Sequence, residues 1–156
     1  MEAIRNHPGA RRALIIWGAL VYSMLMYIVV GYLLVKDESI SESFIHDPRS
    51  RMLILIALVI IALGFGLSQR IISYNRHYIP TLPIEKRPGQ AISAFMVPFL
   101  IRMAVLESLG LMGLIMTMNT GDILAVAILC GITILGQLLL FPSANRIAEW
   151  SGLSAH

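Results

Sequence analysis

Charged side chains are scarce in this chain. Asp, Glu, Lys and Arg together make up 13% of its 156 residues, whereas hydrophobic residues make up 57%. An average soluble domain is about one-quarter charged and about half apolar. A soluble fold of this length would leave much apolar surface in contact with water. The composition therefore excludes an ordinary soluble domain and predicts that the lipid bilayer is part of the solvent.

Motifs that carry chemistry are scarce as well. The one cysteine, Cys130, excludes an intrachain disulfide, and we expect it to pack as a small apolar side chain. The four histidines lie outside the apolar runs and lack the spacing of metal ligands. The sequence contains no glycine-rich phosphate loop and no nucleophile–base set that water could reach. We therefore expect no catalytic residue, no metal and no cofactor.

Four long apolar runs are what the sequence does contain. Each is close to the roughly 20 residues that a helix needs to cross a bilayer, and none shows the alternation of a barrel strand. The expected fold is an all-α integral membrane protein, a small bundle of four transmembrane helices in a single domain over residues 1–156. The expected spans cover about 14–35, 52–69, 92–118 and 122–141. The first run is about twice as long as the core of a secretory signal and lacks a cleavage site, so we expect it to remain as a span.

The basic residues predict an orientation. Eight Lys or Arg residues lie in the N-terminal segment, the connection 70–91 and the tail, against three in the connection 36–51. The positive-inside rule then places both termini and the loop 70–91 in the cytoplasm, with a bacterial inner membrane as the expected location. Because these residues lie at the ends of apolar runs and the net charge is only +3, we expect no nucleic-acid partner. We expect a tight turn at 119–121 and a short interfacial helix at 143–151.

Glu107 is the residue that most needs an explanation. It lies about 15 residues into the third run, which at about 1.5 Å per residue is close to the bilayer midplane. A charged carboxylate is costly there, so we expect it to be protonated or to face a partner group. A midplane carboxylate is what a proton or sodium relay needs. A packing hydrogen bond to a neighbouring helix is the structural alternative, and the sequence leaves both open.

Arg102 lies five residues before Glu107 in the same run. Five residues turn a helix by about 500°, so the two side chains point roughly 140° apart and are not expected to pair within the helix. We expect the Arg102 guanidinium to snorkel to the cytoplasmic headgroups along its apolar stem. The alternative is that it neutralises Glu107 on a neighbouring chain.

Small residues near Glu107 predict close helix packing. Gly110 lies three residues after Glu107 and therefore toward the same face, with Ser108 and Gly113 nearby. Small side chains let helices approach each other closely in lipid. In the fourth run, Ala127 and Gly131 form a second small-residue pair.

Residues 64–116 carry a resemblance to a known family. They run from "GFGLSQR" through a loop containing "KRPGQA" to "MAVLESLGLMGLIM". This pattern resembles the hairpin of the rotor-ring c subunit of rotary ATP synthases. The resemblance implies that Arg87 and Pro88 stand for the loop motif of that family and that Glu107 stands for its ion-binding carboxylate. Gly113 then belongs to the glycine-containing run that follows the carboxylate.

Three functional hypotheses follow from these features. The first is a small non-enzymatic subunit or accessory protein of a larger inner-membrane assembly, and its partners are the bilayer and other membrane subunits. The second is an ion-translocating oligomeric subunit, with Glu107 as the proton or sodium carrier and further copies of the chain as partners. The third is a lipid enzyme that uses His77, Arg76 and Glu85 of the middle loop. We rank the first hypothesis highest because the glycine ladder of the rotor family is short here.

Overall fold

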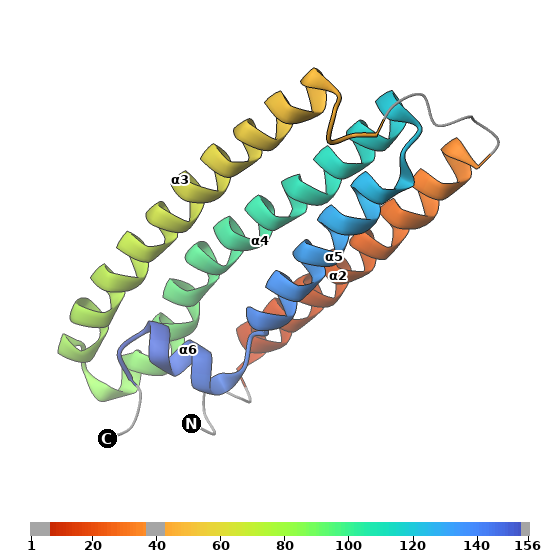
Figure 1. Ribbon diagram of the computed structural model, residues 1–156. Coiled ribbons are helices and arrows are strands. Elements are labelled where there is room, and N and C mark those ends of the chain that lie inside the picture. Colours follow the sequence, from red (N-terminus) through yellow and green to blue (C-terminus); the bar gives the residue numbers. More distant parts are fainter. Residues whose placement is uncertain (1–6, 37–42, 154–156) are drawn as a thin grey trace.

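Helices dominate the structure. The computed structural model describes residues 7–36 and 43–153, and within these ranges it contains no β-strand. Four long helices run side by side (Figure 1). They are α2 (Pro8–Val35), α3 (Pro48–Tyr78), α4 (Arg87–Thr120) and α5 (Ile123–Leu139); the short helix α6 (Ala144–Trp150) follows, and the 3-10 turns η1 (Ile79–Thr81) and η2 (Ile84–Lys86) join α3 to α4. The predicted all-α class is confirmed.

Three helical stretches are long and apolar enough to cross a membrane. They are Pro8–Val35, Pro48–Thr81 and Ile84–Thr120. The helix α5 has 17 residues and passes the same test only together with α6, from which it is bent by 81°. The described residues therefore supply three candidate spans, or four if α5 and α6 count as one broken span.

Residues 70–91 are predicted to form a loop, and this prediction is wrong because most of them are helical. The helix α3 continues through this segment to Tyr78, and α4 already begins at Arg87. Polar side chains end an apolar run, but they do not end a helix. The break comes where Pro80 and Pro83 interrupt the backbone hydrogen bonding. The α3–α4 hairpin therefore extends beyond the apolar runs of its two helices.

A hydrogen bond from Asn75 joins the two arms of this hairpin at the turn of α4 that precedes Pro98. Pro98 lies inside α4 and has no amide hydrogen, so the carbonyl oxygen of Ala94 loses its partner within the helix. The side-chain amide of Asn75, on α3, donates a hydrogen bond to that oxygen at 3.0 Å. The gap that the proline leaves in α4 is thus filled by a side chain from the neighbouring helix.

Carboxylates define where two of the long helices begin. The side chain of Asp47 accepts a hydrogen bond from the amide of Ser50 at 2.8 Å at the start of α3. The side chain of Asp122 accepts one from the amide of Leu124 at 3.0 Å at the start of α5. Between α4 and α5, Gly121 has a φ of 72°, which glycine adopts without strain. The chain therefore turns at Gly121 and Asp122, whereas Asn119 and Thr120 of the turn predicted at 119–121 still belong to α4.

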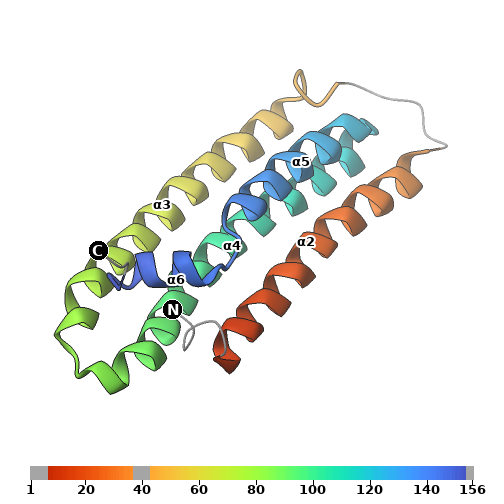
Figure 2. The same ribbon diagram turned by 90° about the horizontal axis from the view of Figure 1, so that it is seen from below.

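The helix α4 is central in the bundle. It packs against α2, α3 and α5, and α2 also packs against α5, whereas α3 packs mainly against α4 and α6. Figure 2 shows α3 and α2 on opposite sides of α4 and α5. The start of α2, the α3–α4 connection and α6 lie at one end of the bundle (Figure 1).

The short helix α6 closes that end. A helix is present within the predicted range 143–151, and the side chains of Ile147 and Trp150 are buried, with exposures of 0% and 7%. The Trp150 ring lies 5.1 Å from the ring of Phe95 on α4. The tail therefore packs on the bundle through one apolar face.

Gly113 sets how closely α4 and α5 approach each other. A Cβ atom there would lie 3.0 Å from Val126 Cα and 3.2 Å from Ala125 O, which are backbone atoms that cannot rotate away. We expect Gly113→Ala to lower the free energy of unfolding by about 1–3 kcal/mol through overpacking. The measurement is unfolding in mild detergent, followed by circular dichroism.

The matched control is Gly131→Ala in α5, where a Cβ atom would meet nothing within 4 Å. We expect this change to stabilise the chain by up to about 1 kcal/mol, because alanine favours a helix over glycine. Equal effects of the two substitutions would contradict the close approach at Gly113. In this structure Gly131 makes no close helix contact, so the predicted small-residue pair with Ala127 is not a packing seam within the chain.

Candidate functional site

Glu107 lies between α4 and α2. The hydroxyl of Ser23 lies 2.8 Å from Glu107 Oε1, and the hydroxyl of Tyr27 donates to the same oxygen at 2.9 Å. Ser23 and Tyr27 are four residues apart and therefore share one face of α2. The carboxyl group thus has two hydroxyl partners on a neighbouring helix of the same chain.

The second carboxyl oxygen has no such partner. Glu107 Oε2 is buried and makes no hydrogen bond within the described residues. A buried acceptor that is left unpaired costs about 1–3 kcal/mol, and a charged one costs more. The site therefore holds one satisfied oxygen and one oxygen that is open to a further donor or cation.

The number of hydroxyl hydrogens constrains the state of the carboxyl group. Ser23 has one hydroxyl hydrogen, yet its oxygen lies 2.7 Å from Leu20 O as well as 2.8 Å from Glu107 Oε1. If Glu107 carries a proton on Oε1, it donates to Ser23, and Ser23 donates to Leu20. Tyr27 then still donates to Oε1. A protonated Glu107 thus satisfies every contact around Oε1, whereas a carboxylate leaves the Ser23 hydrogen with two competing acceptors.

The glycines near Glu107 serve two different interfaces. A Cβ atom at Gly110 would lie within 3.0 Å of both Met24 Sδ and Met24 Cε on α2. Gly110 therefore supports the same helix pair as Glu107, whereas Gly113 faces α5. The hydroxyl of Ser108 donates to Val105 O of its own helix at 2.7 Å and does not reach the carboxyl group.

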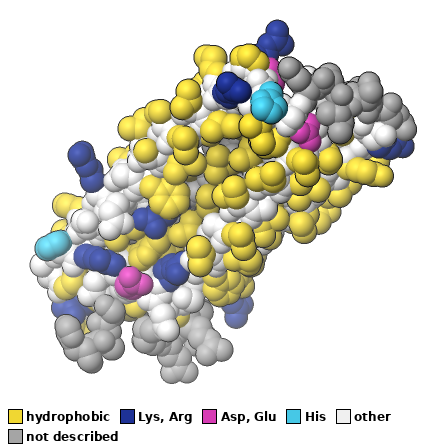
Figure 3. Space-filling model, in the orientation of Figure 1, with side chains coloured by type: hydrophobic (Ala, Val, Ile, Leu, Met, Phe, Trp, Pro, Cys, Tyr) yellow, Lys and Arg dark blue, Asp and Glu magenta, His cyan; other side chains and the backbone are white. Residues whose placement is uncertain are grey.

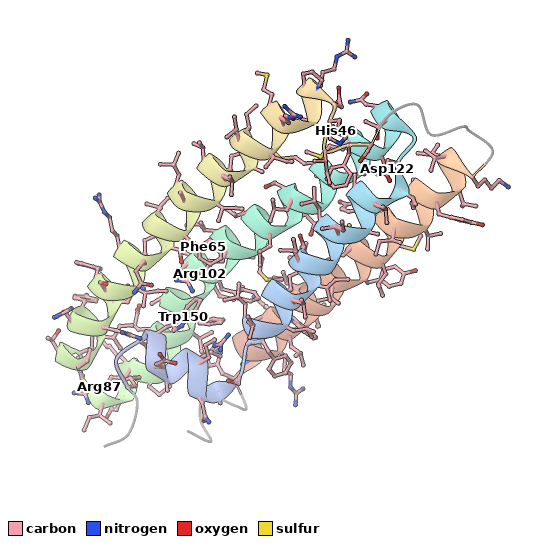
Figure 4. All side chains as sticks on the ribbon, viewed as in Figure 1. His46, Phe65, Arg87, Arg102, Asp122 and Trp150 are labelled. Atoms are coloured by element: carbon pink, nitrogen blue, oxygen red, sulfur yellow. The ribbon has the colours of Figure 1, made fainter. Side chains whose placement is uncertain are left out.

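Arg102 faces the opposite neighbour of α4. Its Nε donates to Ser68 Oγ at 2.6 Å, and its Nη2 donates to Gln69 Oε1 at 3.0 Å, both on α3. The guanidinium carbon lies 5.0 Å from the ring centroid of Phe65 and 4.7 Å from that of Trp150. Figure 4 shows Arg102 between these two rings. Arg102 and Glu107 are therefore not brought together, in agreement with the divergence that helix geometry predicts.

The structure does not gather the other candidate residues around Glu107. Arg87 and Pro88 open α4, about 30 Å along the helix from Glu107, and Arg87 Nε donates to Leu82 O at 2.8 Å. The middle-loop candidates have separate surroundings. Arg76 pairs with Glu149 at 3.2 Å, His77 Nδ1 lies 2.7 Å from Ser73 O, and Glu85 lies exposed in η2.

The partners of Glu107 and Arg102 cannot be identified from the sequence. For Glu107, the available signal is a serine and a tyrosine that lie four residues apart on one face of the first run. Nothing in the sequence shows that this face meets α4. For Arg102, the signal is Ser68 and Gln69 at the end of the second run.

A further polar group lies buried where α5 packs on α2. The Trp17 indole donates to Gln137 O at 2.7 Å. The Gln137 side chain is fully buried, and its amide nitrogen and oxygen have no partner within the described residues. The hydroxyl of Thr133 donates to Leu106 O of α4 at 3.1 Å. Polar groups in this bundle therefore act mainly as contacts between helices.

Among the described residues, no cluster of three or more His, Cys, Asp or Glu side chains is arranged to hold a metal ion. Comparison of the chain with protein-family models, with curated proteins and with solved structures finds no match. The function of the chain is therefore inferred from the geometry of Glu107 and Arg102 and from the surfaces around them.

Tyr27→Phe tests the contact between Glu107 and α2. Because the substitution removes one of the two hydroxyls on Oε1 and leaves Ser23 in place, we expect it to lower the free energy of unfolding by about 0.5–1.5 kcal/mol. Tyr22→Phe is the control on the same helix, because Tyr22 is 63% exposed. The readout is unfolding in mild detergent.

A Glu107→Leu background completes the test as a double-mutant cycle, in which Tyr27→Phe is expected to cost less than it does in the unmodified chain. If Tyr27→Phe and Tyr22→Phe have the same small effect, the hydrogen bond does not contribute to stability.

Proposed function

We propose that this chain is a small non-enzymatic membrane subunit that belongs to a larger inner-membrane assembly, with four spans and both termini in the cytoplasm. The observation that carries the proposal is the position of Glu107 between two helices of its own chain. Glu107 is the residue best suited to carry an ion, but it forms hydrogen bonds with Ser23 and Tyr27 of α2 and so acts in helix packing. Arg102 and Trp17 likewise bond to neighbouring helices.

The outward surface of α3 also supports this proposal. Leu55, Val59 and Leu63 recur at every fourth position, and their side chains are 64%, 58% and 69% exposed. Such a stripe is suited to lipid or to the helices of other membrane subunits. Because α3 packs mainly against α4 and α6, one long side of it is free for lateral contacts.

Native mass measurement in mild detergent tests the proposed function. We expect the chain to be recovered in a complex with other membrane polypeptides at a fixed molar ratio. A parallel purification from cells that lack the tagged chain identifies contaminants. A homo-oligomer that contains no other polypeptide would contradict the proposal and would favour the second candidate.

The second candidate is an ion-translocating oligomeric subunit with Glu107 as the proton or sodium carrier. It is supported by the buried, unpaired Oε2 atom and by the resemblance of residues 64–116 to the rotor hairpin. An oxygen that is held in an apolar bundle and left without a partner is suited to bind and release a cation.

Flux into proteoliposomes, followed with a pH-sensitive or sodium-sensitive dye, tests this candidate. We expect Glu107→Gln to abolish flux while the chain stays folded, because an amide cannot exchange the carboxyl proton. Glu85→Gln removes the same charge from the exposed turn η2 and is expected to leave flux unchanged. Full flux in Glu107→Gln would eliminate Glu107 as the carrier.

A further inference from the structure

A groove lined by apolar side chains runs between α3 and α5 over the surface of α4. It has a volume of about 180 Å³. The residues that line it are Ile54, Ala57, Leu58 and Ile61 of α3, Leu109 and Met116 of α4, and Leu129 and Ile132 of α5. We call it the α3–α5 groove.

Arg102 lies on the same stripe of α4 as two residues of the groove. Arg102, Leu109 and Met116 are spaced seven residues apart, and residues at this spacing differ by only about 20° in direction around a helix. On α3, Phe65 lies four residues after Ile61 of the groove, and its ring contacts the guanidinium of Arg102. Arg102 does not line the groove itself but lies about 10 Å beyond Leu109 along α4.

Several cations lie at the end of the bundle beyond the groove. Figure 3 shows hydrophobic side chains along the middle of this face and, toward the end where α6 lies, Lys and Arg side chains together with an acidic side chain. Glu149 of α6 is paired with Arg76 at this end. Trp150 of α6 stacks on the Arg102 guanidinium there (Figure 4). Arg146, a second cation, lies on α6, the helix whose Trp150 contacts Arg102.

The charge of Arg102 is not neutralised by the chain itself. Within the described residues no carboxylate lies at salt-bridge distance from Arg102, whose two hydrogen bonds go to uncharged groups. A guanidinium has five N–H donors, so most of them remain for another acceptor. An unpaired cation in an apolar surrounding is costly, and the oxygens of a phosphate match the guanidinium fork.

The depth of Arg102 fits a lipid phosphate. Eighteen residues separate it from Thr120 at the other end of α4, which is about 27 Å along the helix. The hydrocarbon core of a bilayer is about 30 Å thick. If Thr120 lies at one boundary of the core, Arg102 lies close to the other. The chain bends by 81° into α6 at the same end, as expected of a segment that lies in the interface.

We propose that the α3–α5 groove binds an anionic phospholipid. One acyl chain lies along the groove, and the phosphate accepts hydrogen bonds from Arg102, with Arg146 adding a second positive charge. An anionic phospholipid supplies an apolar chain and a phosphate together, which matches a groove lined by apolar side chains and a cation on the same stripe of α4. This inference rests on the proposed insertion of the chain in a membrane, but it does not depend on a protein partner.

Native mass spectrometry of the full-length chain tests the proposal. The chain is released from nanodiscs that contain equal amounts of phosphatidylglycerol and phosphatidylcholine, and the retained lipids are counted. We expect about tenfold more retained phosphatidylglycerol than phosphatidylcholine, and we expect Arg102→Gln to abolish that preference. Arg70→Gln is the matched control, because Arg70 lines a separate hollow on α3 with Gly66 and Leu67.

A second pair of variants tests the groove itself and decides the question if Arg102→Gln does not fold. Leu58→Trp places a large ring into the groove, whereas Leu55→Trp places the same ring on an exposed position of α3 that is not part of the groove lining. We expect Leu58→Trp to reduce phosphatidylglycerol retention several-fold and Leu55→Trp to leave it unchanged.

Several outcomes overturn the proposal. The first is that the unmodified chain retains the two lipids equally. The second is that Arg102→Gln and Arg70→Gln lose the same amount of retained phosphatidylglycerol. The third is that a co-purified polypeptide excludes phosphatidylglycerol from the chain. A chain recovered in the soluble fraction overturns both this inference and the proposed function. A membrane-embedded chain that forms its protein complex but shows no lipid preference overturns this inference alone.

Discussion

The hydrogen bonds that Glu107 and Arg102 make to opposite neighbours of α4 fix where α2 and α3 lie. Helices in lipid gain little by burying apolar surface against each other, because lipid tails are equally apolar. Glu107 joins α4 to α2 through two hydroxyl groups, and Arg102 joins α4 to α3 through Ser68 and Gln69. Each contact also relieves the cost of a polar group in an apolar surrounding. The central position of α4 depends on this pair of opposed contacts.

The third neighbour of α4 is held differently. No charged side chain joins α4 to α5 among the described residues. Instead, Gly113 lets the backbone of α5 approach closely, and the Thr133 hydroxyl donates to Leu106 O at 3.1 Å. The two kinds of contact have different effects: side-chain hydrogen bonds join α4 to α2 and α3, whereas a small residue sets the distance between α4 and α5. The α3–α5 groove remains because α3 and α5 each pack on α4 but not on each other.

Hydropathy locates all four long helices because each contains an apolar run that stands out from the polar segments around it. It places the end of α3 near Gln69, whereas the helix continues to Tyr78, because an apolar run ends where polar side chains begin and a helix ends where its backbone hydrogen bonding is interrupted. Glu107 can be found from the sequence alone, since a carboxylate in an apolar run stands out. Its partners cannot, because hydroxyl residues are common in membrane helices and the pairing depends on which helices are neighbours. The stacking of Trp150 on Arg102 likewise depends on where the tail folds back.

The bond from Asn75 to the carbonyl oxygen that Pro98 leaves free has a mechanical consequence. At this turn α4 lacks one of its own backbone hydrogen bonds, and the bond from Asn75 takes its place across the α3–α4 interface. Sliding α3 along α4 would break that bond and leave the Ala94 carbonyl oxygen without a partner, so the bond opposes a change of register between the two arms of the hairpin.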